Sequence, residues 1–231
     1  MKKMDKVDSK EVGLEIGLLL TRFFFNSEDL HFGYWPDGTP TDMSTISKAQ
    51  SNHSDLIFSN IPDGVKNILD VGAGSGELAK KLIDQGYSVD CVSPSSFLSD
   101  TIQSKLPPQS TLYRTTLEDL ETDHRYDLII FSESFQYVNI QSGLSKCAHL
   151  LKHHSHLLIC DFFSIETDSK SPLRGGHKIS KFLEAINQFP FENIIDLDVT
   201  KETAPTIGIL DKLLTEFLIP SKDLSAKYLS S

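Results

Sequence analysis

The stretch from Ile68 to Ala79, with the sequence ILDVGAGSGELA, limits the possible folds more than any other part of this 231-residue chain. A short apolar run ends at Asp70, a turn with three glycines follows, and an amphipathic helix is expected to begin after Gly76. This order is typical of nucleotide-type sites, where glycines allow backbone N–H groups to approach a ligand closely. The pattern predicts an α/β fold with its ligand at the carboxyl end of a strand.

Two well-known nucleotide motifs do not fit this stretch. The dinucleotide fingerprint requires a third glycine three residues after the second, but Glu77 occupies that position and Gly76 comes one step early. The phosphate-binding P-loop requires Gly-Lys-Ser/Thr, which is absent. An NAD-dependent oxidoreductase also needs an acid after the second strand, where this chain has Ser93, so that class is kept only as an alternative.

Composition and charge narrow the class of partner. The formal net charge of −10 argues against nucleic acids and acidic membranes as partners. No apolar run approaches the roughly 20 residues that span a membrane, and acids interrupt the N-terminal lysines, unlike in a secretory signal. Cys91, Cys147 and Cys160 lie within apolar patterns, which favours reduced thiols. We therefore expect a cytoplasmic protein, monomer or homodimer, that acts on a small molecule.

Two segments carry a resemblance to a known family. The D-x-G-x-G-x-G arrangement that starts at Asp70 resembles the first motif of class I S-adenosylmethionine (SAM)-dependent methyltransferases of the small-molecule type. Residues 126–138, YDLIIFSESFQYV, resemble the fourth-strand motif of the same family, and the whole resemblance covers roughly residues 30–205. It implies a doubly wound, Rossmann-like and mostly parallel sheet with helices on both faces. It also implies SAM as cofactor and S-adenosylhomocysteine as product.

The resemblance also implies roles for individual residues. Ser93 departs from the family, which usually has an acid there to bind the two ribose hydroxyls, and a hydroxyl binds a diol more weakly than a charged acceptor does. The candidates for orienting or deprotonating the acceptor are Glu133, His177, Tyr34 and His31. The residues expected to bind the cofactor are Tyr34, Asp70, Gly72, Ala73, Gly74, Gly76, Ser93, Pro94, Leu117, Glu118, Ser132 and Glu133.

The remaining patterns predict the organisation of the chain. Helical periodicity predicts helices over residues 9–25 and 44–60, and residues 1–60 are expected to form an N-terminal helical cap or lid on a SAM-binding domain of residues 61–231. Further along, we expect a strand over residues 191–199 and a helix from Pro205 to about Leu218. The family's sheet normally ends in a seventh, antiparallel strand, for which the sequence after this helix offers no candidate.

The function implied by the resemblance is in-line transfer of the SAM methyl group to an O, N or C atom of a small molecule in a water-excluded pocket. Two alternatives stay open besides the oxidoreductase: a non-catalytic SAM- or nucleotide-binding module, and a SAM-fold enzyme with a non-methylating reaction. His149 and His153 are four residues apart, which could suit a metal. A position in the last turn of a helix explains them more simply, so no metal site is predicted.

Overall fold

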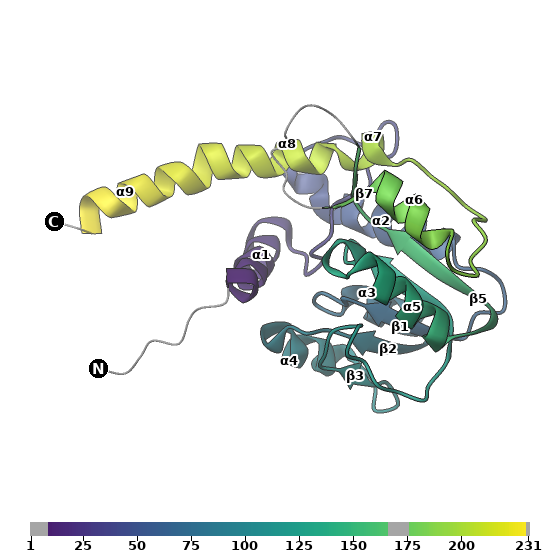
Figure 1. The fold of residues 1–231 in the computed structure, drawn as a ribbon. Coiled ribbons are helices and arrows are strands. Elements are labelled where there is room, and N and C mark those ends of the chain that lie inside the picture. Colours follow the sequence, from purple (N-terminus) through teal and green to yellow (C-terminus); the bar gives the residue numbers. More distant parts are fainter. Residues whose placement is uncertain (1–8, 166–175, 230–231) are drawn as a thin grey trace.

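A five-stranded sheet forms the centre of the computed structural model, which describes residues 9–165 and 176–229 (Figure 1). All pairings in this sheet are parallel, and the strand order is β3-β2-β1-β4-β5. The strands are β1 (Asn67–Val71), β2 (Ser88–Val92), β3 (Leu112–Tyr113), β4 (Tyr126–Ser132) and β5 (Leu151–Cys160). The strand order reverses between β1 and β4, and in doubly wound sheets ligands bind at the carboxyl ends of strands beside such a point.

Both faces of the sheet are covered. On one face, Ile68 and Ile130 pack against α3 (Glu77–Asp84) and α4 (Ser96–Lys105). On the other face, Leu69 and Phe131 pack against α5 (Ile140–Leu150) and α6 (Ile179–Ile186). Neighbouring residues of a strand point to opposite faces, so strands buried on both sides contain continuous apolar runs, such as Leu128–Phe131 of β4. The predicted doubly wound fold is confirmed.

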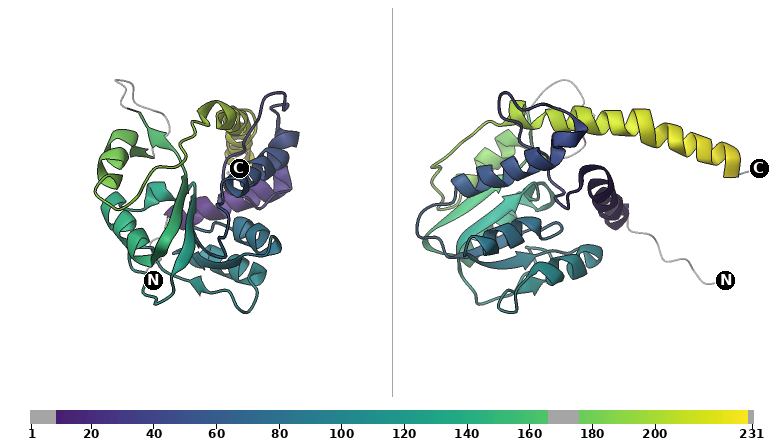
Figure 2. Two further views of the ribbon diagram at one scale, coloured as in Figure 1. Left: turned by 90° about the vertical axis from the view of Figure 1, so that its right-hand side faces the viewer. Right: turned by 180° about the vertical axis from the view of Figure 1, so that it is seen from behind.

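The N-terminal helices pack beside the sheet. They are α1 (Ser9–Phe25), the short helix η1 (Met43–Thr45) and α2 (Ile46–Ser59) (Figure 2). Their bounds agree closely with those of the two helices predicted from the sequence. Leu18 of α1 and Ile57 of α2 are buried in the same core as α3 and α4. The carboxylate of Glu11 accepts hydrogen bonds from Ser95 Oγ (3.1 Å) and Phe97 N (2.9 Å), which ties α1 to the beginning of α4.

The C-terminal part corrects two expectations. Residues 191–199 form no strand, and Ile194, Ile195 and Leu197 are exposed. Apolar, β-branched residues favour a strand only where a neighbouring strand and a packing surface receive them, and here none does. In the described chain, the sheet has no sixth or antiparallel seventh strand. The short β6 (Phe163–Ser164) and β7 (His177–Lys178) pair only with each other.

The last helix does not end near Leu218 as expected. After α7 (Thr200–Thr203), the segments α8 (Pro205–Lys212), the π-helical η3 (Leu213–Leu218) and α9 (Ile219–Leu229) follow one another, and α9 projects from the body (Figure 1). Pro220 does not end this helical run; it lies just after the π-helical segment, in which the regular i→i−4 hydrogen-bond pattern is already interrupted. Among the helices in the described ranges, none is both long and apolar enough to cross a membrane.

One buried hydroxyl group, that of Thr206, connects α8 to the loop between α1 and η1, which contains Gly33 and Trp35. Thr206 Oγ1 accepts hydrogen bonds from Gly33 N (3.0 Å) and Trp35 Nε1 (3.1 Å). Thr206→Val keeps the shape but leaves both donors unpaired, so the free energy of unfolding should fall by about 2–4 kcal/mol. Urea titration followed by fluorescence of Trp35, the single tryptophan, measures this loss. Thr206→Ser retains the hydroxyl and should lose less than about 1 kcal/mol; an equal loss in both variants would contradict the explanation.

Candidate functional site

The glycine-rich turn connects β1 to α3 at the edge where the strands end. Gly72, Gly74 and Gly76 have φ values of 74°, 54° and 83°, a region that residues with a Cβ rarely adopt. Gly72 N donates to Val92 O at 2.8 Å, which fixes the turn to β2. A Cβ atom on Gly72 would lie 2.4 Å from Ser134 Cβ. The turn after β1 and the turn after β4 are therefore in direct contact, and only glycine fits between them.

Asp70 is buried just before this turn. Its side chain is 1% exposed, and Oδ2 has no hydrogen-bond partner among the described residues. Burial raises the pKa of Asp70 to about 7, although the nearby charge of His31 opposes the shift. Ser132 Oγ, at the end of the adjacent β4, is likewise buried and unpaired in the described structure. Unpaired buried polar atoms are costly, so a ligand that supplies hydrogen-bond donors or positive charge would stabilise this edge.

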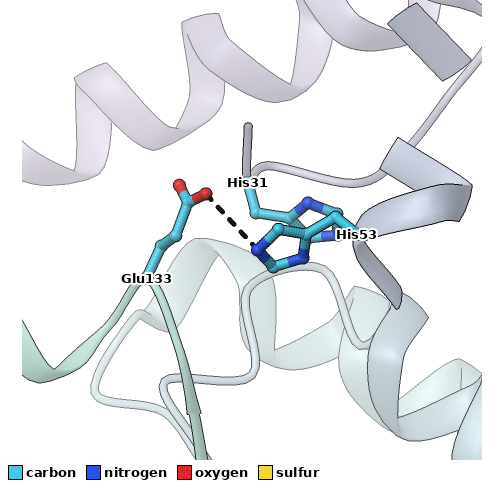
Figure 3. A group of neighbouring side chains, drawn as sticks. All are labelled: His31, His53 and Glu133. Atoms are coloured by element: carbon cyan, nitrogen blue, oxygen red, sulfur yellow. Dashed lines mark ion pairs between the residues drawn. The ribbon is translucent and has the colours of Figure 1, made fainter. Parts of the chain in front are cut away.

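Glu133, His31 and His53 form a largely buried cluster (Figure 3). Glu133 has a φ of 55°, and its Oε1 accepts a hydrogen bond from Phe32 N at 2.9 Å. The same oxygen lies 3.8 Å from His53 Nε2. The rings of His31 and His53 stack with their centroids 4.3 Å apart and their planes inclined by 24°. The cluster joins the loop between α1 and η1, helix α2 and the end of β4.

A chain of charged groups shifts the pKa values of the two imidazoles in opposite directions. Lys81 Nζ contacts Asp29 Oδ2 at 2.8 Å, and Asp29 Oδ1 lies 3.3 Å from His31 Nε2. Burial lowers the pKa of His31, but the Asp29 carboxylate overcomes this effect and the pKa is raised. Burial and the charge of His31 lower the pKa of His53 to about 3, so His53 is neutral at pH 7. Burial raises the pKa of Glu133 to about 7, despite the charge of His31.

The cluster could be read as a metal site, since His31, His53 and Glu133 each offer a donor atom within 4.8 Å of the others. Zinc needs the in-plane lone pairs of both imidazoles to converge at about 2.0–2.1 Å. Stacked rings direct their lone pairs into separate, nearly parallel planes. In addition, His31 Nδ1 contacts Phe32 O at 2.8 Å while Nε2 faces Asp29. The arrangement suits proton sharing better than metal ligation.

The other residues expected at the site lie at different places. His177 Nε2 lies 2.9 Å from Val138 O and 3.2 Å from Phe135 O, both in the segment after β4. Tyr34 lines a shallow hollow with residues of α2. Leu117 is buried in the core against α5. The expected residues that the structure brings together at the strand ends are Asp70, Gly72, Ala73, Gly74, Gly76, Ser132, Glu133 and His31.

The loops after β2 and β3 flank this group. Ser93 is 3% exposed, and its backbone N donates to Tyr113 O at 3.0 Å. Pro94 follows it on the surface. Glu118 Oε1 accepts a hydrogen bond from Asn139 N at 2.9 Å, so its carboxylate braces the beginning of α5.

His53 is the member of the cluster that sequence reasoning missed, because residues 44–60 were interpreted only as a packing helix. A signal was available. His53 lies four residues after Ala49 and four before Ile57, both of which are buried, so it falls on the apolar face of α2. A polar side chain on a buried face needs partners there. Asp161 and Cys160, at the end of β5, were also missed, because their approach to Glu133 depends on the pairing of β4 with β5.

Comparison with known proteins identifies the domain that carries this site. A family model described as "Methyltransferase domain" matches residues 68–154, which include the glycine turn, Glu133 and the strands from β1 to β4. Residues 68–154 are a class I methyltransferase domain. The family predicted from the two motifs is thereby confirmed.

Curated relatives match part of this chain. An uncharacterised methyltransferase of Mycobacterium bovis is 26% identical over 92 residues, which are 40% of this chain and 38% of that protein. A ubiquinone biosynthesis O-methyltransferase of Rickettsia akari is 33% identical over 138 residues, 55% of this chain and 49% of that protein. The chain thus spans about half or less of the length of these relatives.

Solved structures share the fold of the methyltransferase domain over most of the chain. The [4+2]-cyclase SpnF superposes with a TM-score of 0.73 at 16% identity, over 95% of this chain and 82% of SpnF. A geranyl diphosphate methyltransferase, in complex with GPP and sinefungin, gives 0.71 at 13% identity, over 88% of both chains. Identities this low show a common architecture, Rossmann-like with N-terminal helices, and nothing about the acceptor.

Proposed function

We propose that this protein binds SAM and transfers its methyl group to a small-molecule acceptor, with S-adenosylhomocysteine as the product. The observation that carries the proposal is Asp70, whose buried Oδ2 lacks a partner beside three glycines with positive φ. The amino-acid end of SAM carries an ammonium group that would satisfy this carboxylate. SAM supplies an activated methyl group on a sulfonium, so the protein has to orient the acceptor and exclude water.

The residues that would hold SAM follow from their positions at the strand ends. We propose Asp70 and the backbone N–H groups of the glycine turn for the amino-acid end. Ser93, after β2, would face the ribose hydroxyls, and the loop of Leu117 and Glu118 would lie toward the adenine. At Gly74, a Cβ would meet only Leu30 Cδ1 at 3.9 Å, which is ordinary contact, so the turn has a side that a ligand can approach.

We also propose that the described part of residues 1–60 acts as a lid over the turn. Three polar contacts join this segment to α3, α4 and the glycine turn and support this role. Ser75 Oγ donates to Glu28 O at 2.6 Å, Lys105 pairs with Glu28, and Lys81 pairs with Asp29. Segments that close over a site in this way exclude water from the reacting groups. SAM would enter when these contacts open and would be sequestered when they form again.

Calorimetric titration with S-adenosylhomocysteine tests the proposal. We expect saturable one-to-one binding to the folded protein and no binding of NAD under the same conditions. NAD binding instead would favour the oxidoreductase alternative. Failure to bind either ligand, with folding verified by circular dichroism, would overturn the cofactor assignment. Transfer of a labelled methyl group from SAM to an acceptor separates the enzyme from a non-catalytic module and from a non-methylating enzyme.

Binding should become stronger as the pH rises through 7. The pKa of Asp70 is raised to about 7 by burial, so at pH 6 most molecules carry the neutral acid. The ammonium group of the ligand pairs with the carboxylate form, and binding therefore expels a proton from Asp70. Affinity for S-adenosylhomocysteine should be about tenfold higher at pH 8 than at pH 6. Titrations in buffers with different heats of ionisation report the released proton, and an affinity independent of pH would contradict this role.

A further inference from the structure

We propose that Glu133, supported by the stacked imidazoles of His53 and His31, forms a proton-accepting site for a hydroxyl group of the acceptor. The acceptor class would then be hydroxylated small molecules, above all phenols, and the methylated atom would be oxygen. This inference rests on the proposed methyl transfer, because it names the acceptor class for that reaction. His53 and His31 are positioning residues in this scheme, since they act through Glu133.

The position of Glu133 supports a role beside the cofactor. It directly follows β4, which pairs with β1, and the register places Ile130 of β4 opposite Asp70 of β1. Its carboxyl group is nearly buried, and Phe32 N holds one oxygen at 2.9 Å. The ring of Phe32 packs edge to face on Phe162 with centroids 4.7 Å apart. A carboxyl group beside aromatic rings suits a flat, apolar acceptor with one polar group.

Every element packed around Glu133 contributes a titratable or charged group. The loop between α1 and η1 supplies His31 and Asp29, and α2 supplies His53. The short helix η2 (Phe135–Tyr137) supplies Tyr137, and Lys81 of α3 pairs with Asp29. At the strand ends lie Asp70, Cys160 and Asp161. Among these, the His31 cation lowers the pKa of Glu133 and the Asp161 carboxyl raises it, while burial is the largest influence and leaves it near 7. A general base is most effective when its pKa lies near the working pH.

His53 is built into the cluster as a neutral donor. Its side chain is 1% exposed, and Nε2 lies 3.4 Å from Cys160 Sγ and 3.8 Å from Glu133 Oε1. Nδ1 has no partner in the described structure, and an imidazole leaves its acceptor nitrogen unpaired at less cost than its donor. With its proton on Nε2, His53 directs the positive end of its N–H dipole toward Glu133 Oε1 from 3.8 Å, which is longer than a hydrogen bond, and this dipole favours the carboxylate electrostatically. The stacked His31 cation keeps His53 from taking a second proton.

The chemistry of the transfer explains why such a site favours a hydroxyl acceptor. A neutral amine can attack the methyl carbon with its lone pair and lose a proton afterwards, whereas a phenol is a weak nucleophile until its O–H bond breaks. The proton passes from the hydroxyl to Glu133, and the resulting oxyanion forms the O–CH3 bond. The S–CH3 bond breaks, and its electron pair remains on sulfur, which becomes a neutral thioether. Glu133 then releases the proton to water.

Carbon-13 NMR of the full chain labelled at glutamate carboxyl carbons tests the cluster without an acceptor. The Glu133 signal is assigned by its loss in Glu133→Gln. We expect a midpoint near pH 7, shifted upward by about one pH unit in His53→Leu and in His31→Gln. His53→Gln restores a donor and should return the midpoint toward the wild-type value. His149→Gln, an exposed histidine beside Arg125, should not move it. An ordinary glutamate midpoint, or none of the expected shifts, would overturn the proposal.

Optical titration with 4-nitrophenol tests the acceptor class. The phenol is added to the complex with S-adenosylhomocysteine at a pH where the free phenol is mostly neutral. Phenolate absorbance should increase with the wild-type protein and not with Glu133→Gln, while both proteins still bind S-adenosylhomocysteine. No increase with the wild-type protein would overturn the hydroxyl assignment and leave cofactor binding intact. If the wild-type protein failed to bind S-adenosylhomocysteine, the proposed function itself would instead be overturned.

Discussion

Asp70→Asn should weaken the binding of S-adenosylhomocysteine at pH 8 by about 100-fold and at the same time stabilise the unliganded protein. The loss of affinity follows from the loss of a charged acceptor, because charge-assisted hydrogen bonds contribute about 1.5–3 kcal/mol each. The gain in stability follows from the sign of the pKa shift. The folded-state pKa of Asp70, about 7, lies above the usual pKa of an aspartic acid side chain, which we take for the unfolded state. Between these two values the folded state holds a proton that the unfolded state releases, so stability falls as the pH rises.

At pH 8 the buried carboxylate therefore destabilises the folded state, and the neutral amide removes that cost. We expect the free energy of unfolding to rise by about 1–3 kcal/mol, since the amide still lacks partners. The gain should shrink as the pH falls toward 5, where folded Asp70 is protonated. Calorimetry and urea titration measure the two effects separately. A variant that lost stability and affinity together would show that Asp70 is structural and not a ligand-binding group.

Asp127→Asn is the matched control at the opposite end of the same two strands. The carboxylate of Asp127 accepts hydrogen bonds from Asn67 N (2.8 Å) and Lys66 N (3.1 Å), and it pairs with Lys152. Its neutralisation should cost about 1–2 kcal/mol of stability and leave the affinity for S-adenosylhomocysteine unchanged within about twofold. A comparable loss of affinity in this variant would mean that general weakening of the sheet explains the effect of Asp70.

Gly72→Ala should lower the free energy of unfolding by about 3–5 kcal/mol and abolish detectable binding of S-adenosylhomocysteine. Two costs add at this position. The φ of 74° is unfavourable for any residue with a Cβ, by about 1–2 kcal/mol. The new Cβ would also lie 2.4 Å from Ser134 Cβ, and overpacking typically costs about 1–3 kcal/mol. Relief of the overlap would push the turn after β1 away from the turn after β4, which would separate Asp70 from Glu133.

Two further variants separate the cost of the positive φ from the cost of the steric overlap. Gly64→Ala carries the same backbone penalty at a φ of 85° but meets nothing within 4 Å, so it should lose only about 1–2 kcal/mol. Ser134→Gly removes the atom that Gly72→Ala would strike. The double variant should therefore be more stable than the sum of the single effects by about 1–3 kcal/mol. Strict additivity would show that the close approach of the two turns contributes nothing.

The positions of the strands and of the glycine turn could be predicted because their causes are local. Apolar runs such as that of β4, residues that permit positive φ, and a proline at the beginning of α8 act within a few residues of the chain. The failed strand at 191–199 shows the limit of such signals. Its β-branched residues have a local preference for extended backbone, but a strand also needs a neighbour to take its hydrogen bonds. The continuation of the last helix past Pro220 was also missed, because a proline normally predicts the end of a helix.

The residues of the candidate site fall into the same two groups, those placed by local sequence and those placed by packing. Asp70, the glycines and Glu133 follow strands directly, so the parallel sheet brings them to one edge, and the sequence by itself determined this part of the site and the methyltransferase family. His53 contacts Glu133 although it lies 80 residues earlier in the chain. Only the packing of α2 decided that contact, the stacking on His31 and the protonation states of both rings. Such pairings depend on burial and distance between segments remote in the chain, and neither quantity is encoded in local sequence patterns.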